Sequence, residues 1–444
     1  GKDALLANTS GSMNVAIGAD ALTTLTTGEK NIAIGYLAGT AITDAEDNVA
    51  IGQQAQEATT TGDRNIAIGT RALDLNQTGN GNTGIGHEAL RTNASSDHNT
   101  AIGQKALYTT TAENNTAVGS NTLDNCTTGP RNVAVGSFAM TNSTTAEECV
   151  MIGQAAGLNV VNGHRNTFVG QSAGYSHTSG QDCVAVGRGA LQANTTTSGI
   201  TAVGKDALYS NTTGERNVAV GFEALKSNTT GQQNVAVGHN ALDASTTAVN
   251  CVAVGRSALG QADGNDNTAL GEFAGHSVTS GTGNIYLGKN ANGGSTAVKQ
   301  VVIGDNFSVG NTNNKAAIAN GNVSASFTGT ASSWSFSSDG RDKTDIVDLS
   351  LGLDFINKLK PRKFRWDFRD KSRFPVDSST AKLTNSGFIA QEVQEVLKEE
   401  NAEYTKIVND DDSEHLTVAA SGMIPMLVNA VKELSAKVTA LEGK

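Results

Sequence analysis

The sequence predicts a mainly β protein in which a parallel β-solenoid of 17-residue coils precedes a small α+β domain. Three observations support this prediction. A five-residue phrase, usually an amide, a β-branched residue, Ala, an aliphatic residue and Gly, occurs eighteen times between Asn14 and Gly304. Its interval is 17 residues apart from three intervals of 16, and a short fixed period indicates stacked coils. The 50 glycines and the 5% of aromatic residues suit a narrow stack, whereas charged and aromatic residues become dense only after residue 338.

The main strand of each coil is expected at the second to fourth positions of the phrase, as in Val218-Ala219-Val220. These positions are mostly apolar in a row, which predicts a strand buried on both faces. One face fills the coil, and the other requires a second partner, for which a neighbouring chain is the obvious candidate. Ala at the third position fits the close approach of another backbone. Gly at the fifth position, such as Gly136, is expected to need a positive φ or a contact that no Cβ permits.

A second short strand is expected at the eighth and ninth positions. The eighth position is Ala in 16 of the first 17 coils and is often followed by Leu, as in Ala72-Leu73. The rest of the coil has turn composition, for example residues 228–231, so the expected order is strand, glycine corner, strand and polar turn. At ~4.8 Å per coil, eighteen coils would form a rod about 85 Å long.

Asn occupies the first position in 13 of the first 17 coils. A catalytic residue is needed once, whereas this one recurs, so a ladder of stacked amides along the rod is the better interpretation. Cys149, Cys183 and Cys251 also take this position and are too far apart for a disulfide within one chain. No Cys/His cluster has zinc-ligand spacing, and neither a metal nor a cofactor is expected.

Charge and hydropathy exclude two classes of partner. The net charge of −11 disfavours sequence-independent nucleic-acid binding, which needs an excess of Lys and Arg. No apolar run is long enough to cross a membrane, and no signal peptide is visible. The first five residues repeat residues 204–208 closely and therefore start within a coil, so we expect a longer protein with an attachment region before Gly1.

The repeat has a known counterpart. Its Asn-x-Ala-x-Gly-x-x-Ala pattern resembles the heads of trimeric autotransporter adhesins. That resemblance implies a left-handed parallel β-roll in which three chains pack together. The period here is longer, which leaves the handedness and the coil shape open. The expectation of a trimer rests on this likeness and on the strand that is apolar on both faces.

The repeat ends at residue 304, and three regions follow from this: a rod over residues 1–304, a β-rich transition segment over 305–337, and a distinct domain over 338–444. Short strands are expected at 316–318 and 324–327, and an amphipathic helix is expected around 390–397. At the C-terminus two sets of residues alternate at the spacing of a coiled-coil seam. The β-branched set favours two strands in isolation, and a single helix packed on its own domain is the alternative. The seam residues are Ile424, Leu427, Val431, Leu434, Val438 and Leu441.

Several ordered phrases of the last domain resemble the C-terminal intramolecular chaperone of phage endosialidases and other tail spikes, a self-cleaving peptidase family. They include residues 338–343, 359–366, 387–393 and 423–434. The resemblance implies a domain that assembles three chains, assists folding of the β-rod and then cuts itself off. It assigns Ser338 as nucleophile and Lys343 as the base that activates it, with Asp339 and Arg341 as supporting residues. The cut bond is left open between the one preceding Ser338 and the Ser338–Asp339 bond.

These features predict a homotrimeric tail fibre of a virion that attaches to a host surface. It would be assembled in the host cytoplasm and would act outside the cell. Expected partners are two further copies, a host receptor or glycan, and other tail proteins bound through a preceding region. The expected chemistry is a single self-cleavage, within one chain or between subunits, without an external substrate. The alternatives are a polysaccharide-degrading tail spike whose site lies outside this sequence, and a bacterial trimeric adhesin. Tyr175 with His177 and Phe273 with His276 are candidate receptor contacts.

Overall fold

The computed structural model describes residues 1–319, 324–328, 335–336, 345–365, 384–409 and 416–443. The chain divides into two compact units, residues 1–337 and 338–444. Within the described residues, no helix is both long and apolar enough to cross a membrane.

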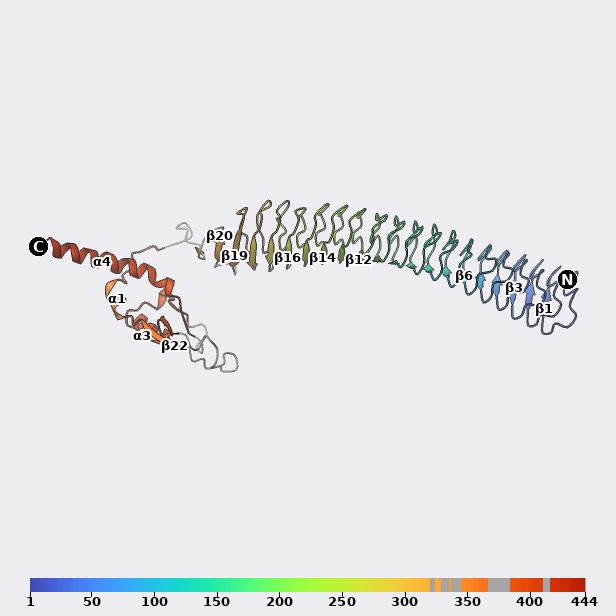
Figure 1. Ribbon diagram of the computed structural model, residues 1–444, viewed down its shortest axis with the longest axis horizontal. Coiled ribbons are helices and arrows are strands. Elements are labelled where there is room, and N and C mark those ends of the chain that lie inside the picture. The colour runs from blue at the N-terminus through green and yellow to red at the C-terminus, as the bar shows by residue number, and fades with distance from the viewer. Residues whose placement is uncertain (320–323, 329–334, 337–344, 366–383, 410–415, 444) are drawn as a thin grey trace. The chain divides into compact units, whose positions relative to one another are not determined.

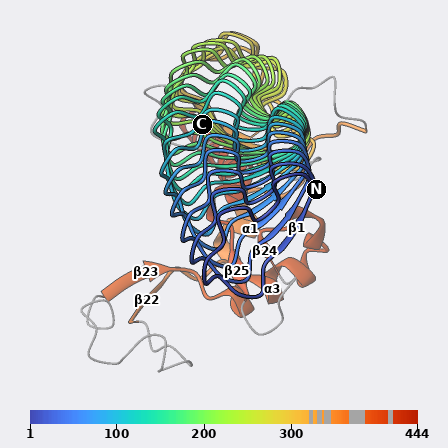
Figure 2. The ribbon, with the colours of Figure 1, turned by 90° about the vertical axis from the view of Figure 1, so that its right-hand side faces the viewer.

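Unit 1 is the solenoid that the repeat predicts, with one short strand per coil, three residues long in the first seventeen coils and four in the eighteenth (Figure 1). Each strand from β1 to β18 pairs in parallel and in register with the next, so that Ala16 faces Ala33 and Ala33 faces Ala50. Seen from the N-terminal end, the coils overlie one another with a small shift at each step (Figure 2). The predicted fold class, a mainly β chain with a parallel β-solenoid, is confirmed.

The strands of this unit are β1 (Val15–Ile17), β2 (Ile32–Ile34), β3 (Val49–Ile51), β4 (Ile66–Ile68), β5 (Thr83–Ile85), β6 (Thr100–Ile102), β7 (Thr116–Val118), β8 (Val133–Val135), β9 (Val150–Ile152), β10 (Thr167–Val169), β11 (Val184–Val186), β12 (Thr201–Val203), β13 (Val218–Val220), β14 (Val235–Val237), β15 (Val252–Val254), β16 (Thr268–Leu270), β17 (Ile285–Leu287), β18 (Val301–Gly304), β19 (Lys315–Ala319), β20 (Ser324–Thr328) and β21 (Ser335–Phe336). In the transition segment, β19 adds a further parallel strand to β18, whereas β20 and β21 pair antiparallel.

The predicted second strand of each coil is wrong, because the eighth and ninth positions lie in a series of turns. The seventh and ninth positions have left-handed backbone, for example φ +59° at Glu88 and +52° at Leu90. The N–H of Glu88 therefore donates to Thr70 O of the preceding coil at 3.0 Å, whereas the N–H of Leu90 donates to Ala106 O of the following coil at 3.0 Å. The alternating direction joins neighbouring coils without forming a strand.

The glycine corner satisfies both expectations stated for it. Gly136 has φ +130°, a region that side chains disfavour. A Cβ at Gly136 would also lie 2.5 Å from Gly153 O in the next coil. The corner is therefore closed to every other residue by conformation and by space.

The asparagine ladder is confirmed, although its main bonds reach the backbone. The N–H of Asn31 donates to Asn14 Oδ1 at 2.9 Å, and Asn31 Nδ2 donates to Ala45 O at 2.8 Å. Asn31 repeats this at the next step, since its Oδ1 accepts the N–H of Asn48 at 3.1 Å, so such an amide satisfies a backbone donor in the next coil and a backbone acceptor in its own. Cys149 replaces the amide donor, since its thiol donates to Gly163 O at 3.2 Å. Burial raises the pKa of the Cys149 thiol to about 11, and all four cysteines are buried and free.

A second polar column inside the rod, at the twelfth position of the coil, was not predicted. Asn76 is fully buried, accepts the N–H of Gly79 at 3.1 Å and donates to Gly79 O at 3.0 Å. Asn93 repeats this arrangement with Ser96 one coil later. These side chains form hydrogen bonds with the backbone groups of the turn. Such bonds are required because the buried groups inside the stack have no bulk water to pair with.

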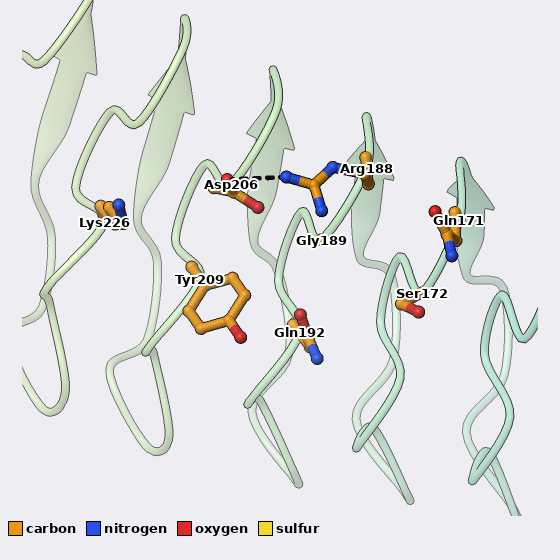
Figure 3. A pocket seen from close by; sticks show the side chains of 8 residues that line it. All are labelled: Gln171, Ser172, Arg188, Gly189, Gln192, Asp206, Tyr209 and Lys226. Carbon is orange, nitrogen blue, oxygen red and sulfur yellow. Dashed lines mark ion pairs between the residues drawn. The ribbon is translucent and has the colours of Figure 1, made fainter.

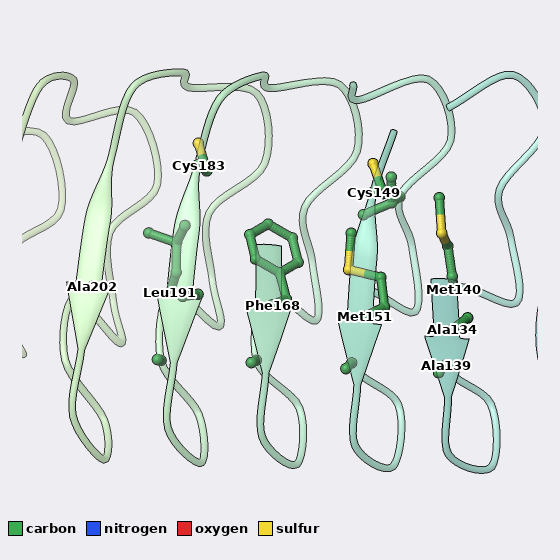
Figure 4. Close-up of a cluster of buried hydrophobic side chains, with 14 of the residues drawn as sticks. Ala134, Ala139, Met140, Cys149, Met151, Phe168, Cys183, Leu191 and Ala202 are labelled. Carbon is green, nitrogen blue, oxygen red and sulfur yellow. The ribbon is translucent and has the colours of Figure 1, made fainter. Parts of the chain in front are cut away.

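The interior is narrow, and residues at the third and ninth positions share its volume. Half of the coils combine Ala with Leu, as in Ala185 and Leu191. In the coil of β10 the third position is Phe168 and the ninth is Gly174, where a Cβ would lie 2.3 Å from Phe168 Cδ2. Figure 4 shows Phe168 and Met151 among the buried side chains of the interior. Large and small residues are therefore exchanged within one coil, which keeps the packing dense.

Unit 2 combines short β-hairpins with helices around a separate core. Its elements are α1 (Leu353–Lys358), β22 (Arg362–Arg365), β23 (Thr384–Gly387), α3 (Ala390–Glu399), η2 (Glu403–Thr405), β24 (Val408–Asn409), β25 (Thr417–Val418), η3 (Ala420–Met423) and α4 (Ile424–Glu442). β22 pairs antiparallel with β23, and β24 pairs antiparallel with β25. The core unites Phe355, Leu397, Ile407 and Met426, and α3 contributes the buried face that its sequence predicts.

Candidate functional site

The four residues assigned to self-cleavage, Ser338, Asp339, Arg341 and Lys343, lie outside the described residues. Their assignment remains a prediction. The candidate functional surfaces that the structure does describe are one face of α4 in unit 2 and one face of the strands in unit 1.

One face of α4 is anchored in its own unit. Met426 and Ala430 are buried in the core. Asn429 Nδ2 donates to Leu349 O at 2.7 Å, and the N–H of Leu353 donates to Glu433 Oε2 at 3.0 Å. Glu433 therefore places its carboxylate at the N-terminal end of α1, where a negative charge is favourable.

The opposite face of α4 carries the coiled-coil seam, and the seam is open. Ile424, Val431 and Leu441 are 58%, 65% and 70% exposed. The alternative, a single helix packed on its own domain, holds for the start of α4, where Met426 and Ala430 pack on unit 2, and the coiled coil stays a prediction. The seam consists of Ile424, Leu427, Val431, Leu434, Val438 and Leu441, all of them exposed large apolar residues. A surface helix that exposes a regular apolar seam is suited to pairing with another helix.

The strands of unit 1 present a second apolar surface, which we call the apolar stripe. It consists of the second and fourth positions of β1 to β18, which point away from the coil interior. In β4, Ala67 is fully buried, whereas Ile66 and Ile68 on either side are 38% and 37% exposed. Thus the predicted burial on both faces is not achieved within one chain, and Ala at the third position faces the interior. The stripe has one pair of side chains per coil along the stack.

The two predicted aromatic and histidine pairs differ in their location. His177 is fully buried and occupies the inner polar column, where Nε2 lies 2.9 Å from Gly180 O and Nδ1 lies 2.7 Å from Asn194 Oδ1. Desolvation lowers the pKa of His177. Its assignment as a receptor contact is wrong, because it replaces an asparagine of that column. Phe273 and His276 remain partly exposed, with their rings 5.5 Å apart.

Glycoside hydrolysis on the rod would need acidic side chains. Two of the rod's acidic side chains are instead engaged in ion pairs. Glu88 contacts Arg91 at 3.2 Å and Lys105 at 3.9 Å, and Glu223 contacts Lys226 at 2.9 Å. These pairs lie within one coil or join adjacent coils, and they indicate a structural role. Among the residues that the structure describes, no three His, Cys, Asp or Glu side chains are grouped so that they could hold a metal ion.

The rod also has a polar hollow that was not predicted from the sequence. It has a volume of about 490 Å³ and centres on Gly189 at the seventh position of the coil (Figure 3). Gly189 is the single glycine at this position in the eighteen coils. Aligning the coils by position would have revealed this difference, whereas a count of conspicuous residues such as His or aromatic side chains does not.

Comparison with known proteins identifies one region. A family model described as the chaperone of endosialidase matches residues 338–401. The matched segment starts at Ser338 and includes the phrase at 387–393 on which the resemblance was based. No curated protein and no solved structure matches the chain.

Proposed function

We propose that this chain forms a homotrimeric fibre of a virion tail, which attaches to a host surface and is assembled by its own C-terminal domain. After assembly that domain removes itself by one autoproteolytic cut. The observation that carries the proposal is the match to an endosialidase-type chaperone over residues 338–401, directly after a long β-solenoid. The fibre would be located on the virion, outside the cell after release from the host cytoplasm where it was made.

The physical need for such a chaperone follows from the rod. Parallel pairing of short strands is non-local, because each strand meets its partner 16 or 17 residues later and a stack must be nucleated before it gains stability. Incomplete stacks expose strand edges and apolar surface, which favours aggregation. A domain that collects the chains and is then lost would speed assembly and make unfolding irreversible.

Self-association would use the apolar stripe and the α4 seam. A partner that covers the stripe must offer apolar groups at the same spacing of ~4.8 Å over many coils. A second and a third copy of this chain have that spacing because their coils are identical. The β-branched and Leu positions of the seam favour two strands in an isolated coiled coil, so a trimer would be imposed by the remainder of the assembly.

The proposed cleavage uses Ser338 as nucleophile. A neutral Lys343 amine accepts the hydroxyl proton while Oγ attacks the scissile carbonyl, and the proton then passes to the leaving amine. Water subsequently hydrolyses the resulting ester. Attack on the carbonyl before Ser338 closes a five-membered ring within one chain. Attack on the Ser338–Asp339 bond requires the hydroxyl of another chain.

The experiment compares freshly expressed protein with the Ser338→Ala and Lys343→Ala variants by denaturing electrophoresis, intact mass and light scattering. We expect two fragments in the parent and one uncut chain in both variants. Fragments of 338 and 106 residues would identify the Ser338–Asp339 bond, whereas fragments of 337 and 107 would identify the preceding bond. We also expect trimers in all three samples. An uncut parent would overturn the peptidase role, and a monomeric parent would overturn the fibre.

A further inference from the structure

The hollow around Gly189 is built from side chains of four successive coils. Ser172 and Gly189 lie on its floor at the seventh position of the coil, and Asp206 follows at the same position in the next coil. Gln171 and Arg188 line one side, and Gln192, Tyr209 and Lys226 line the other (Figure 3). The hollow therefore runs across coils, and its lining is separate from the apolar stripe at the second and fourth positions.

Three different groups converge on the space above Gly189. A Cβ at this residue would lie 2.5 Å from Asp206 Oδ1, 3.3 Å from Gln192 Oε1 and 3.4 Å from Tyr209 Cδ2. A carboxylate, an amide and the edge of an aromatic ring thus meet at one point that only glycine leaves open. The preceding coil also has a small residue at this position, Ser172, which lines the hollow.

The lining selects a ligand that is itself polar on most of its surface. Seven of the eight lining residues, all except Gly189, carry a polar or charged group, which does not suit a lipid or an apolar cofactor. The amides and the carboxylate offer donors and acceptors side by side. Tyr209, which is 37% exposed, adds an aromatic surface on which C–H groups pack. A pyranose ring combines these properties, since its edges carry hydroxyl groups and its faces carry C–H groups.

The charges of the hollow are largely compensated. Arg188 Nη2 lies 3.6 Å from Asp206 Oδ2, and Lys205 Nζ lies 3.5 Å from the same oxygen. Lys226 Nζ lies 2.9 Å from Glu223 Oε1. Cations that are already paired with carboxylates attract a phosphate or an acidic peptide only weakly. The same paired groups are well oriented to hydrogen-bond hydroxyl groups.

We propose that the hollow around Gly189 binds a pyranose unit of a cell-surface glycan. The inference rests on the proposed role in host attachment, for which it names the ligand class and the place. Asp206 and Gln192 would bind ring hydroxyl groups, Arg188 would bind a further hydroxyl at the edge, and Tyr209 would pack against a face of the sugar. The glycan would cross the rod at the coils of β10 to β13.

The test measures the binding of small probes to the full-length protein by saturation-transfer NMR. The probes are methyl glucopyranoside, methyl galactopyranoside, N-acetylglucosamine and glucuronic acid, with triglutamate as an anionic peptide. The Gly189→Asn variant places a side chain in the hollow and is compatible with the left-handed backbone of this position. Asn has φ +53° at Asn121 and +54° at Asn240, both at the seventh position. Ser257→Asn makes the same side chain at the same position in a coil outside the hollow.

We expect at least one sugar to bind the parent and Ser257→Asn, and to lose binding in Gly189→Asn. Tyr209→Ala should bind roughly three- to tenfold more weakly, whereas Tyr36→Ala, which removes an exposed tyrosine of another coil, should bind like the parent. Absence of sugar binding in the parent, unchanged binding in Gly189→Asn, or binding of triglutamate alone would each overturn the proposal. Light scattering and cleavage of the same samples report on the fibre separately, so a trimer that cleaves but binds no sugar refutes the glycan site alone.

Discussion

The exchange of volume between the third and ninth positions of a coil can be tested with Phe168 and Gly174. Phe168→Ala removes a fully buried ring, and Gly174→Leu adds a side chain where the first added atom would lie 2.3 Å from that ring. Together the two changes recreate the pair Ala and Leu that the neighbouring coil has as Ala185 and Leu191. Leu is compatible with the backbone, since Gly174 has φ +59° and Leu191 has φ +55°.

The structure gives the direction and the size of each effect. Phe168→Ala alone leaves a cavity in a closely packed interior and should lower the free energy of unfolding by about 3–5 kcal/mol. Gly174→Leu alone forces a side chain against a rigid ring and should cost about 1–3 kcal/mol or more. The double variant should lie within about 1 kcal/mol of the parent, so the coupling between the two sites should be at least about 3 kcal/mol.

The assay is urea denaturation of the full-length protein followed by circular dichroism, with hydrogen exchange of peptides from β9 to β11. The exchange data are needed because a stack of coils can open locally around a defect. Ala185→Gly with Leu191→Ala provides a matched reduction of volume without compensation. A double variant of Phe168 and Gly174 that is no more stable than its worse single variant would refute the shared-volume reasoning.

Three further predictions concern the surface, the inner column and the backbone. Ile68→Glu places a charge on the apolar stripe and should dissociate the proposed trimer in light scattering, whereas Thr61→Glu in an exposed turn should not. Because burial lowers the pKa of His177, the unfolded chain binds more protons below its pKa of ~6.5, so stability should fall as the pH falls below that value. His177→Asn should flatten this dependence in thermal unfolding between about pH 7.5 and 5. Leu90→Ile should lower the urea midpoint, since a β-branched residue at φ +52° costs about 1–2 kcal/mol, whereas Leu270→Ile in a strand should not.

The period of the repeat was sufficient to predict the stacked coils and the position of the main strand. The invariant fifth glycine predicted a special corner, and Gly136 confirms both of its proposed causes. The recurrence of asparagine predicted the ladder, because a side chain repeated in most coils can bond to its equivalents in neighbouring coils. These features are visible in sequence because each is repeated at one position many times.

The second strand was predicted wrongly because Ala-Leu pairs were interpreted by their hydrophobicity alone. A better signal lies in the residues that are missing. Threonine, valine and isoleucine are abundant in the chain, yet none occupies the seventh or ninth position of the eighteen coils. Left-handed backbone disfavours β-branched residues, so their exclusion marks the positive φ values of Glu88 and Leu90.

Single positions were harder to interpret than repeated ones. His177 stood out by residue type, but its location in the inner polar column follows only from its place at the twelfth position of the coil. Gly189 was one glycine among 50 and becomes informative only beside the larger residues at the same position in other coils. The residues assigned to cleavage rest on the family likeness, since a serine and a lysine five residues apart carry little information alone.

The regularity of the rod also gives a physical reason for a separate aligning domain in the proposed trimer. In the proposed trimer, a shift of one rod by a whole coil would lose one of eighteen layers of contact and leave the others nearly unchanged. Such a stack specifies register weakly, in the same way as a flat repetitive sheet. Unit 2 has no 17-residue period, so in the proposed trimer its contacts, including any made by the α4 seam, would not repeat with each coil. The register of the fibre would therefore be set at its C-terminal end and transmitted coil by coil, after which the aligning domain is no longer required.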